Sequence, residues 1–260
     1  MKKHDLPEAA LPRLASFSPP IRALVFGSSG GLGRVITDLL RAQPAVGEVT
    51  GGEVTGGEVY AASRGNEDPW GFSFDDESSI ARVVAAATAK GPLDLVIVAT
   101  GILHTEALQP EKTWRSLTAE SLQTLFQVNA VGPALIAKHC LPHLRRDAKA
   151  VFAAISARVG SIEDNQRGGW HSYRASKAAL NMLLRNFAIE LKLRNPRALC
   201  VGLHPGTVDT ALSQPFQSGL PAGQLQSPLA SAAAMLNVID RLRVEDSGRL
   251  WAWDGSPIPF

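Results

Sequence analysis

The sequence lacks the features that mark secreted, membrane and metal-binding proteins. Its 260 residues include only two cysteines, Cys140 and Cys200, without CxxC spacing, and its six histidines show no ligand spacing. We therefore expect free, buried thiols and no metal site. No apolar run is long enough to cross a bilayer and no apolar signal segment follows Met1, so we expect a cytoplasmic protein without a membrane partner.

A strong excess of one charge is also missing. The chain carries 26 Lys and Arg residues against 24 Asp and Glu residues, a net charge of +2. Proteins that bind nucleic acid usually show a larger basic excess or a basic stripe. No nucleic acid partner is therefore expected.

Short apolar segments alternate with amphipathic helical stripes from residue 21 to the end of the chain. The expected strands are 21–26, 59–63, 72–74, 93–100, 149–155, 198–203 and 249–253. The expected helices are 32–42, 77–89, 120–146, 173–193 and 227–242, the third bent near Gly132 and Pro133. Apolar strands in this alternation predict an α/β fold: one Rossmann-type domain over 21–260, a doubly wound parallel sheet with helices on both faces.

Two segments fall outside this alternation. Residues 1–20 contain four prolines and are expected to form an irregular N-terminal arm. The unit Gly-Glu-Val-Thr-Gly repeats in tandem within 47–58. A period of five residues is too short for a solenoid, so we expect an expanded surface loop, with a binding hairpin as the alternative.

A glycine-rich turn follows the first expected strand and opens the first helix. It reads Gly-Ser-Ser-Gly-Gly-Leu-Gly over 27–33. Glycines allow the backbone to approach a ligand closely, and a helix start presents N–H groups to a pyrophosphate. The turn therefore predicts a nucleotide site at the carboxyl ends of the strands, unless it is only a tight strand–helix connection.

An arginine follows the second expected strand, where many NAD enzymes carry an acidic residue. The strand ends Ser63-Arg64. A guanidinium suits the 2′-phosphate of NADP, and Ser63 adds a hydroxyl. We therefore expect NADP(H) to be preferred, with NAD(H) possible, unless Arg64 is only a solvated surface residue.

Tyr173 and Lys177 lie one helical turn apart at the start of an expected helix. A phenol with a pKa of about 10 is a poor acid or base at neutral pH, and a nearby ammonium lowers that pKa. Such a pair suits proton transfer at a carbonyl oxygen while a nicotinamide moves the hydride. The alternative is a buried tyrosine that happens to lie near a surface lysine.

Together, the spacing of Gly27, Gly31 and Gly33 and the Tyr-x-x-x-Lys motif resemble the short-chain dehydrogenase/reductase family. The segment before Tyr173 resembles the branch that holds the C-factor and related carbonyl reductases. The resemblance implies that cofactor contacts come from the glycine loop, the strand ends and the Pro-Gly segment 205–210. The implied cofactor residues are Gly27, Ser29, Gly31, Leu32, Gly33, Ser63, Arg64, Asp75 (or its neighbour Asp76), Gly101, Lys177, Pro205, Gly206, Val208 and Thr210.

The resemblance also implies the catalytic set. Tyr173 would be the acid/base, Lys177 would lower its pKa and hold the ribose, and Asn129 would support a proton relay. The sequence departs from the family in two places: Val98-Ala99-Thr100 replaces Asn-Asn-Ala before Gly101, and Ala157 replaces the catalytic serine. Ser156 is the expected substitute, with Ser161 as an alternative; otherwise the activity is weak, since losing one such donor costs about 10²–10³ in rate.

The expected function is an NADPH-dependent carbonyl reductase or alcohol dehydrogenase acting on a small-molecule carbonyl or alcohol. Trp170 and Ile162 are candidates for the apolar side of the substrate pocket, unless Trp170 only packs the loop in which it lies. The alternative is a signalling or regulatory protein that binds the cofactor with little turnover. The family resemblance further implies a homodimer or homotetramer built on helices 120–146 and 173–193.

Overall fold

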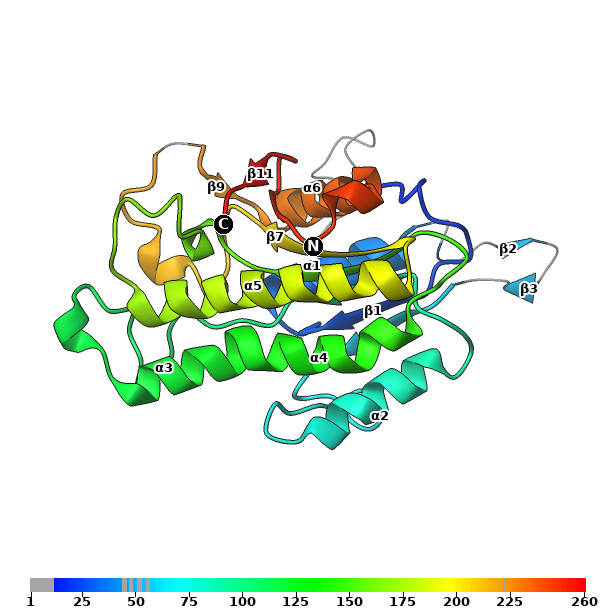
Figure 1. The fold of residues 1–260 in the computed structure, drawn as a ribbon, viewed down its shortest axis with the longest axis horizontal. Coiled ribbons are helices and arrows are strands. Elements are labelled where there is room, and N and C mark those ends of the chain that lie inside the picture. Colours follow the sequence, from blue (N-terminus) through cyan, green and yellow to red (C-terminus); the bar gives the residue numbers. More distant parts are fainter. Residues whose placement is uncertain (1–11, 44–45, 47–48, 51–52, 55–56, 222) are drawn as a thin grey trace.

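The structure is a computed structural model that describes residues 12–43, 46, 49–50, 53–54, 57–221 and 223–260 (Figure 1). Its centre is a seven-stranded sheet in the order β11-β10-β7-β6-β5-β1-β4, parallel except for β11. The strands are β1 (Ala23–Phe26), β4 (Val59–Ala62), β5 (Leu95–Val98), β6 (Ala150–Ile155), β7 (Ala198–His204), β10 (Leu250–Ala252) and β11 (Pro257–Ile258). The predicted doubly wound parallel sheet is confirmed.

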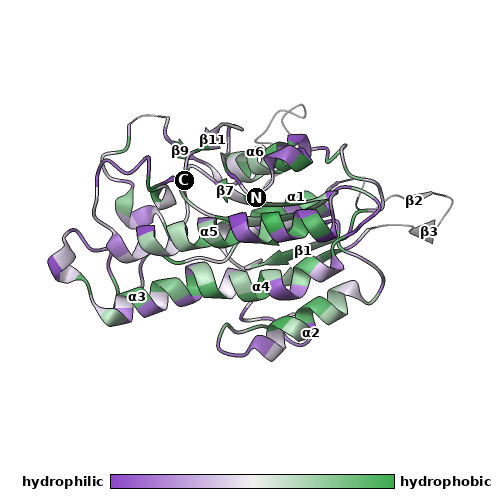
Figure 2. Ribbon diagram, viewed as in Figure 1, coloured by the Kyte–Doolittle hydropathy of each residue, from purple (hydrophilic) through white to green (hydrophobic). Residues whose placement is uncertain are grey.

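Helices cover both faces of this sheet. α1 (Gly31–Arg41) and α6 (Pro228–Arg241) pack on one face, and α2 (Glu77–Thr88), α4 (Gly132–Cys140) and α5 (His171–Arg194) pack on the other. Successive strand side chains alternate between the two layers, so Val25 joins the first core and Phe26 the second. Figure 2 shows the resulting pattern, with hydrophobic strands inside and helices that are hydrophobic on one side only.

The expected strand at 72–74 does not form, and β4 is therefore the edge of the sheet. Two isolated bridges, Ser63 with Gly71 and Ser73 with Asp76, are the pairings recorded there. The nine residues 63–71 fold back in a tight turn in which Ser63 N donates to Trp70 O. Phe72 then enters the core against Phe26, with ring centroids 5.2 Å apart, instead of extending beside β4.

The expected helix 120–146 is divided into several pieces. α3 (Ala119–Phe126) passes into a π-helical turn at Gln127–Val131, which is followed by α4 and a 3₁₀ turn at Leu141–His143. The irregularity thus begins five residues before the Gly132-Pro133 pair at which a bend was expected. Pro133 lies in the first turn of α4, where a missing N–H costs little.

The described part of the N-terminal segment, residues 12–20, contains no helix or strand and belongs to the core. Leu14 and Phe17 are buried in the cluster that contains α1 and α6. Lys149, at the start of β6, donates to Ser16 Oγ at 2.8 Å and lies 5.0 Å from the Phe17 ring centroid. Residues 1–11 lie outside the described residues.

Two short strand pairs lie outside the main sheet. Within the repeat at 47–58, β2 (Val49–Thr50) pairs antiparallel with β3 (Glu53–Val54), while 47–48, 51–52 and 55–56 lie outside the described residues. β8 (Thr207–Val208) pairs in parallel with β9 (Leu225–Gln226) after β7. None of the helices in the described ranges has the length and apolar character needed to cross a membrane.

Candidate active site

The glycine loop between β1 and α1 is closed so tightly that side chains are excluded at two positions. Gly27 has φ +82°, and a Cβ there would lie 2.9 Å from Ala99 C and Thr100 N. A Cβ on Gly33 would lie 2.2 Å from Gly27 O. α1 begins at Gly31 and its N-cap, Gly30, has no side chain to satisfy the first N–H groups. This end of α1 is therefore suited to accept a phosphate.

The loop after β7 crosses directly over this turn. A Cβ on Gly31 would lie 3.0 Å from Thr210 Cγ2. Gly206 has φ +77°, and Val208 is buried where β8 pairs with β9. Leu32 packs against the core beneath the turn and Ser29 is exposed above it. The structure thus brings together two of the predicted cofactor-binding segments, 27–33 and 205–210.

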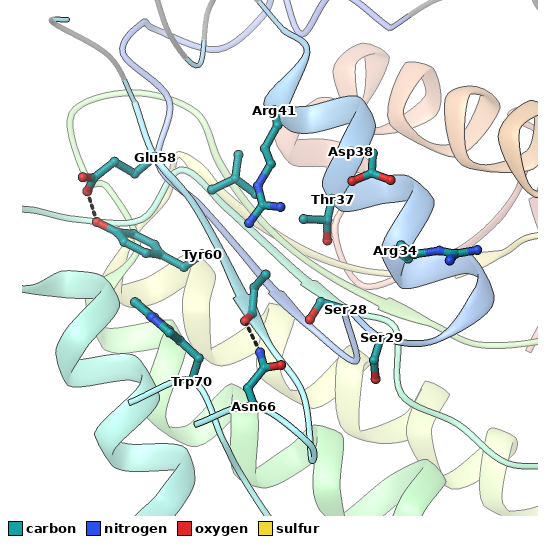
Figure 3. Close-up of a pocket in the computed structure, with 12 residues that line it drawn as sticks. Ser28, Ser29, Arg34, Thr37, Asp38, Arg41, Glu58, Tyr60, Asn66 and Trp70 are labelled. Carbon is teal, nitrogen blue, oxygen red and sulfur yellow. Dashed lines mark hydrogen bonds between the residues drawn. The ribbon is translucent and has the colours of Figure 1, made fainter. Parts of the chain in front are cut away.

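A groove of about 690 Å³ extends from the glycine loop between α1 and the edge strand β4 (Figure 3). Its cationic side chains are Arg34 and Arg41, and Figure 3 shows Arg41 reaching into it from α1. Arg64 does not line the groove; it is exposed and forms no ion pair with any residue that the structure describes. The complete lining is Ser28, Ser29, Arg34, Thr37, Asp38, Arg41, Glu58, Val59, Tyr60, Ala61, Asn66 and Trp70.

The groove adds two arginines that the sequence analysis missed. Arg34, Thr37 and Arg41 follow i, i+3, i+7 spacing on one face of α1, and this spacing was visible in the sequence. Ser63, expected to face the cofactor, is buried and donates its hydroxyl to Asn66 Oδ1 at 2.9 Å. The groove therefore presents Asn66, rather than Ser63, beside the strand end.

The two aspartates after 72–74 have different roles. Asp76 is the N-cap of α2, and its Oδ1 accepts from Ser78 N at 3.0 Å. Asp75 is exposed and does not cap the helix. Of the two, Asp75 is the residue whose carboxylate is available to a ligand.

The first turns of α5 bring the predicted catalytic residues together. Tyr173 and Lys177 are both buried, and Lys177 Nζ lies 5.9 Å from the Tyr173 ring centroid while donating to Ile155 O at 2.9 Å. A Cβ on Gly101 would lie 3.4 Å from Asn129 Oδ1 and 3.5 Å from Lys177 Nζ. These four residues therefore surround one point at the carboxyl ends of β5 and β6.

Asn129 owes its position to the π-helical turn. Its Oδ1 accepts from Ile102 N and its Nδ2 donates to Ile102 O, both at 2.9 Å. Nδ2 also lies 3.1 Å from Ser176 Oγ on α5. The wide turn thus directs one amide to the loop after β5 and to α5 at once, a use common to π-helical turns at functional sites.

Burial governs the protonation of both central groups. It lowers the pKa of Lys177 to about 8 and raises the pKa of Tyr173 above its ordinary value. Desolvation of the enclosed phenol thus outweighs the lowering of the Tyr173 pKa that was expected from a nearby ammonium. At neutral pH Tyr173 therefore carries its proton.

The hydroxyl of Ser156 is not brought to Tyr173. Ser156 is 2% exposed and donates to Asn181 Oδ1 at 2.7 Å. Ala157 instead packs in the apolar cluster that contains Tyr173. Ser161, the other candidate, is also buried, and its Oγ accepts from Asp164 N at 3.0 Å.

An aromatic wall stands over Tyr173. The Trp170 ring centroid lies 6.3 Å from that of Tyr173 and 5.1 Å from that of Phe216, which lies 5.6 Å from His104. Ile162, expected beside Trp170, is 75% exposed and lies outside this cluster. Phe216 and His104 were missed because their distant segments meet only in the fold.

Trp170 has an unusual backbone conformation and is bonded to the main chain of Glu111, a buried acidic residue that the sequence analysis also missed. Its φ is +51°, and its N–H donates to Glu111 O. The Glu111 carboxylate accepts from Ser172 N and Ser121 Oγ, both at 3.2 Å, and from Ser172 Oγ. Although burial alone would raise it, the pKa of Glu111 is lowered by these hydrogen bonds. Glu111 therefore fixes the start of α5.

Three buried polar atoms near these strand ends have no hydrogen-bond partner among the described residues. They are Thr100 Oγ1, His104 Nε2 and His204 Nδ1. Such atoms are costly unless water or a ligand satisfies them. Together with the glycine cradle at 27–33, they fit a polar ligand bound along the carboxyl ends of β1, β5 and β7.

Comparisons with known proteins agree with this geometry. Residues 22–220 match the family described as short chain dehydrogenase. The C-signal protein of Myxococcus xanthus is 35% identical over 183 residues, which cover 69% of this chain and 99% of that protein. The 1-hydroxy-2-glutathionyl-2-methyl-3-butene dehydrogenase of Rhodococcus sp. (strain AD45) is 32% identical over 187 residues, 72% of this chain and 77% of that protein.

Solved structures show the same fold. The carbonyl reductase Sniffer of D. melanogaster superposes with a TM-score of 0.76 at 22% identity, covering 94% of this chain and 100% of that one. An NADPH-bound carbonyl reductase from chicken fatty liver gives 0.74 at 23% identity, covering 95% of this chain and 97% of that one. At these identities the likeness concerns the fold alone.

Proposed function

Because the chain belongs to the short-chain dehydrogenase family of oxidoreductases, we propose that it is an NADPH-preferring carbonyl reductase. The observation that carries this proposal is the buried phenol of Tyr173, protonated at neutral pH and one turn from Lys177. Asn129 and Gly101 lie beside the same lysine. A proton donor at this place suits reduction of a carbonyl group.

The residues present fit a dinucleotide. The glycine cradle and the free start of α1 would hold the pyrophosphate. The segment 205–210, which meets the cradle at Thr210, would hold the nicotinamide end. Arg34 and Arg41 in the groove, with the exposed Arg64 two residues beyond the end of β4, favour a 2′-phosphate and hence NADPH. When bound, the nicotinamide supplies the hydride.

The chain's own groups supply the proton. Tyr173 gives its hydroxyl proton to the carbonyl oxygen as the alcohol forms. The Lys177 ammonium stabilises the phenolate that remains, and Asn129 holds the Ile102 backbone and Ser176 in register around the pair. We do not assign a carbonyl contact to Ser156, because its hydroxyl is bonded to Asn181.

A cofactor-binding signalling protein is the second candidate. It is favoured by 35% identity to the C-signal protein and by Ala157 at the family serine position. Such a protein would bind the dinucleotide but would turn over carbonyl substrates slowly or not at all. Retention of Tyr173, Lys177 and Asn129 in one cluster favours the reductase.

The test is a calorimetric titration with NADPH and NADH, followed by turnover assays on aromatic and aliphatic ketones and aldehydes. The reductase requires tighter NADPH binding and turnover that Tyr173→Phe abolishes without weakening NADPH binding. Binding without turnover would establish the signalling candidate. No binding of either nucleotide at millimolar concentration would overturn both.

We further propose that the chain assembles as a homodimer through α5 and works in the cytoplasm. α5 exposes a stripe of three apolar side chains, defined by Met182 (62% exposed), Ile189 (54%) and Leu193 (84%). Burying such a stripe against a second copy removes apolar surface from water. Both cysteines are free and buried, as suits a reducing compartment.

A further inference from the structure

One imidazole on the substrate side of the site has no explained role. His104 lies six residues beyond the end of β5, and its Nε2 is buried without a hydrogen-bond partner among the described residues. Its ring packs edge-on against Phe216, with centroids 5.6 Å apart. A buried ring nitrogen in this condition is satisfied only by a water molecule or a ligand.

Ring contacts connect His104 to the aromatic wall over Tyr173. Phe216 contacts Trp170, and Trp170 contacts Tyr173, so one row of rings joins the imidazole to the phenol. The other side chains of this cluster are apolar: Ile102, Leu103, Leu108, Leu125, Ala157 and Val159. His104 therefore brings a polar atom to an otherwise apolar wall.

The site around Tyr173 lacks the donor of the family serine. A carbonyl oxygen that gains charge during reduction is best stabilised by a second donor besides the acid. Ala157 has no hydroxyl, and Ser156 donates its hydroxyl to Asn181 Oδ1. Ser161 is buried beyond the 3₁₀ turn Arg158–Gly160, where its Oγ accepts from Asp164 N. The family position and its neighbour Ser156 therefore supply no free donor.

The two other unpartnered atoms lie elsewhere. Thr100 belongs to the cofactor side, since its N lies 2.9 Å from a Cβ placed on Gly27. His204 lies at the end of β7 under the electrostatic influence of Arg158, Asp254 and Asp164. His104 is the unpartnered group that packs with the aromatic wall over Tyr173.

We propose that His104 donates a hydrogen bond from Nε2 to the carbonyl oxygen of the substrate, in place of the absent serine hydroxyl. This inference rests on the proposed function. The imidazole keeps its proton throughout: the carbonyl carbon gains a hydride from NADPH, and the oxygen gains the proton of Tyr173. The rings of Trp170 and Phe216 make aromatic ketones and aldehydes the substrate class.

Two substitutions of His104 separate its hydrogen bond from its packing. His104→Phe keeps an aromatic ring against Phe216 but removes the donor, and we expect kcat for acetophenone to fall about 10²–10³-fold. His104→Gln keeps an N–H donor, so the hydrogen bond can still form. We expect kcat of this variant for acetophenone to fall less than about tenfold. NADPH affinity should be unchanged in both. His143→Phe, at an exposed histidine, is the matched control.

A second-site change tests the replacement itself. In the His104→Phe background, Ala157→Ser returns a hydroxyl to the family position. We expect the double variant to have a kcat at least about tenfold above that of His104→Phe, because one oxyanion donor changes kcat by about 10²–10³-fold. The inference is overturned if His104→Phe keeps wild-type kcat, if it changes KM alone, or if Ala157→Ser restores nothing.

Failure of the proposed function would be distinguishable. If the wild type turns over no carbonyl compound, the reductase proposal fails, and His104 is then tested by NMR of its ring nitrogens. Acetophenone added to the NADP-bound protein should shift the His104 Nε2 resonance and leave that of His143 in place. An unchanged His104 resonance at saturating acetophenone overturns the inference independently of turnover.

Discussion

Lys177 and Tyr173 are buried together, and burial favours the uncharged form of both. The pKa of Lys177 is lowered to about 8, so its ammonium is lost as the pH rises through that value. The phenolate left by proton donation is then no longer stabilised. We expect kcat/KM for ketone reduction to fall about tenfold per pH unit above pH 8 in a pH–rate profile.

Lys177→Arg is the control for this profile, because a guanidinium keeps its charge throughout the range. The variant should be slower at pH 7 but should show no fall near pH 8. A wild-type profile that stays level to pH 9.5, or the same fall in Lys177→Arg, would contradict the role given to the ammonium.

Glu111 links the loop at 108–112 to the start of α5, and its pKa is lowered by hydrogen bonds. Its folded pKa lies below the unfolded value, so its stabilisation is present above that value and is lost as the pH falls. Glu111→Gln should lower the free energy of unfolding by about 1.5–3 kcal/mol at pH 7, the range for a hydrogen-bonded charge. Urea unfolding at pH 7 and pH 3 measures this.

The difference in unfolding free energy between wild type and Glu111→Gln should narrow at pH 3, because the stabilisation that comes from a lowered pKa is lost as the pH falls. Glu120→Gln, at an exposed carboxylate of α3, should leave the unfolding curve in place. If the difference in unfolding free energy between wild type and Glu111→Gln stays constant with pH, the loss of stability comes from altered packing and not from the lost charge.

The clustering of Tyr173, Lys177 and Asn129 was predictable because each residue lies in a short motif that can be recognised in the sequence alone. Glu111 and His104 were not, since their partners Ser172 and Phe216 lie 61 and 112 residues away. The orientation of Ser156 was predictable only in part: alternation along a strand separates it from Ala157, but its bond to Asn181 required the structure.

Among helices and strands, too, the features set by local sequence were predictable and those set by distant contacts were not. Buried strands and long helices were predicted within a few residues, because apolar runs and helical stripes determine them locally. The strand expected at 72–74 failed because the tight turn at 63–71 sends Phe72 into the core. The expected bend near Gly132 is instead a π-helical turn that carries Asn129, and no glycine or proline signal marks that position.

The apolar stripe on α5 can be tested by placing a charge in it. Ile189→Glu places a charge in the middle of the apolar stripe, so it should convert the dimer to a monomer in light scattering coupled to gel filtration. Unfolding should change little, because Ile189 is exposed in the single chain.

Lys192→Glu is the matched control, since Lys192 is also exposed on α5 but lies off the stripe. It should leave the dimer intact. A wild type that is monomeric at micromolar concentration, or a dimer that survives Ile189→Glu, would overturn the proposed interface.

Across the whole molecule, Lys149 joins three distant parts of the chain. Its Nζ donates to Ser16 Oγ in the N-terminal segment and to the carbonyls of Ile239, Asp240 and Leu242 at the end of α6, each at 2.8 Å. A cation at a helix C-terminus also interacts favourably with the negative end of the helix dipole. Lys149→Met should therefore lower the free energy of unfolding by about 1.5–3 kcal/mol, the range for a hydrogen-bonded charge.

Urea unfolding followed by circular dichroism measures this loss. Lys192→Met removes an exposed lysine and should shift the midpoint little. Equal midpoints for Lys149→Met and wild type would show that the packing of Leu14 and Phe17 and the bond from Ser16 N to Asp240 Oδ1 suffice to hold the N-terminal segment.

The segment from β8 to Phe216 touches both halves of the site. Thr210 lies against Gly31 in the phosphate cradle, and six residues later Phe216 closes the aromatic wall beside His104. A dinucleotide that fixes Thr210 also fixes much of the wall, so the carbonyl compound meets a prepared surface. Thermodynamic linkage makes the effect reciprocal. In the proposed reductase, bound alcohol should therefore raise the equilibrium affinity for the oxidised dinucleotide, as the dinucleotide raises that for the alcohol.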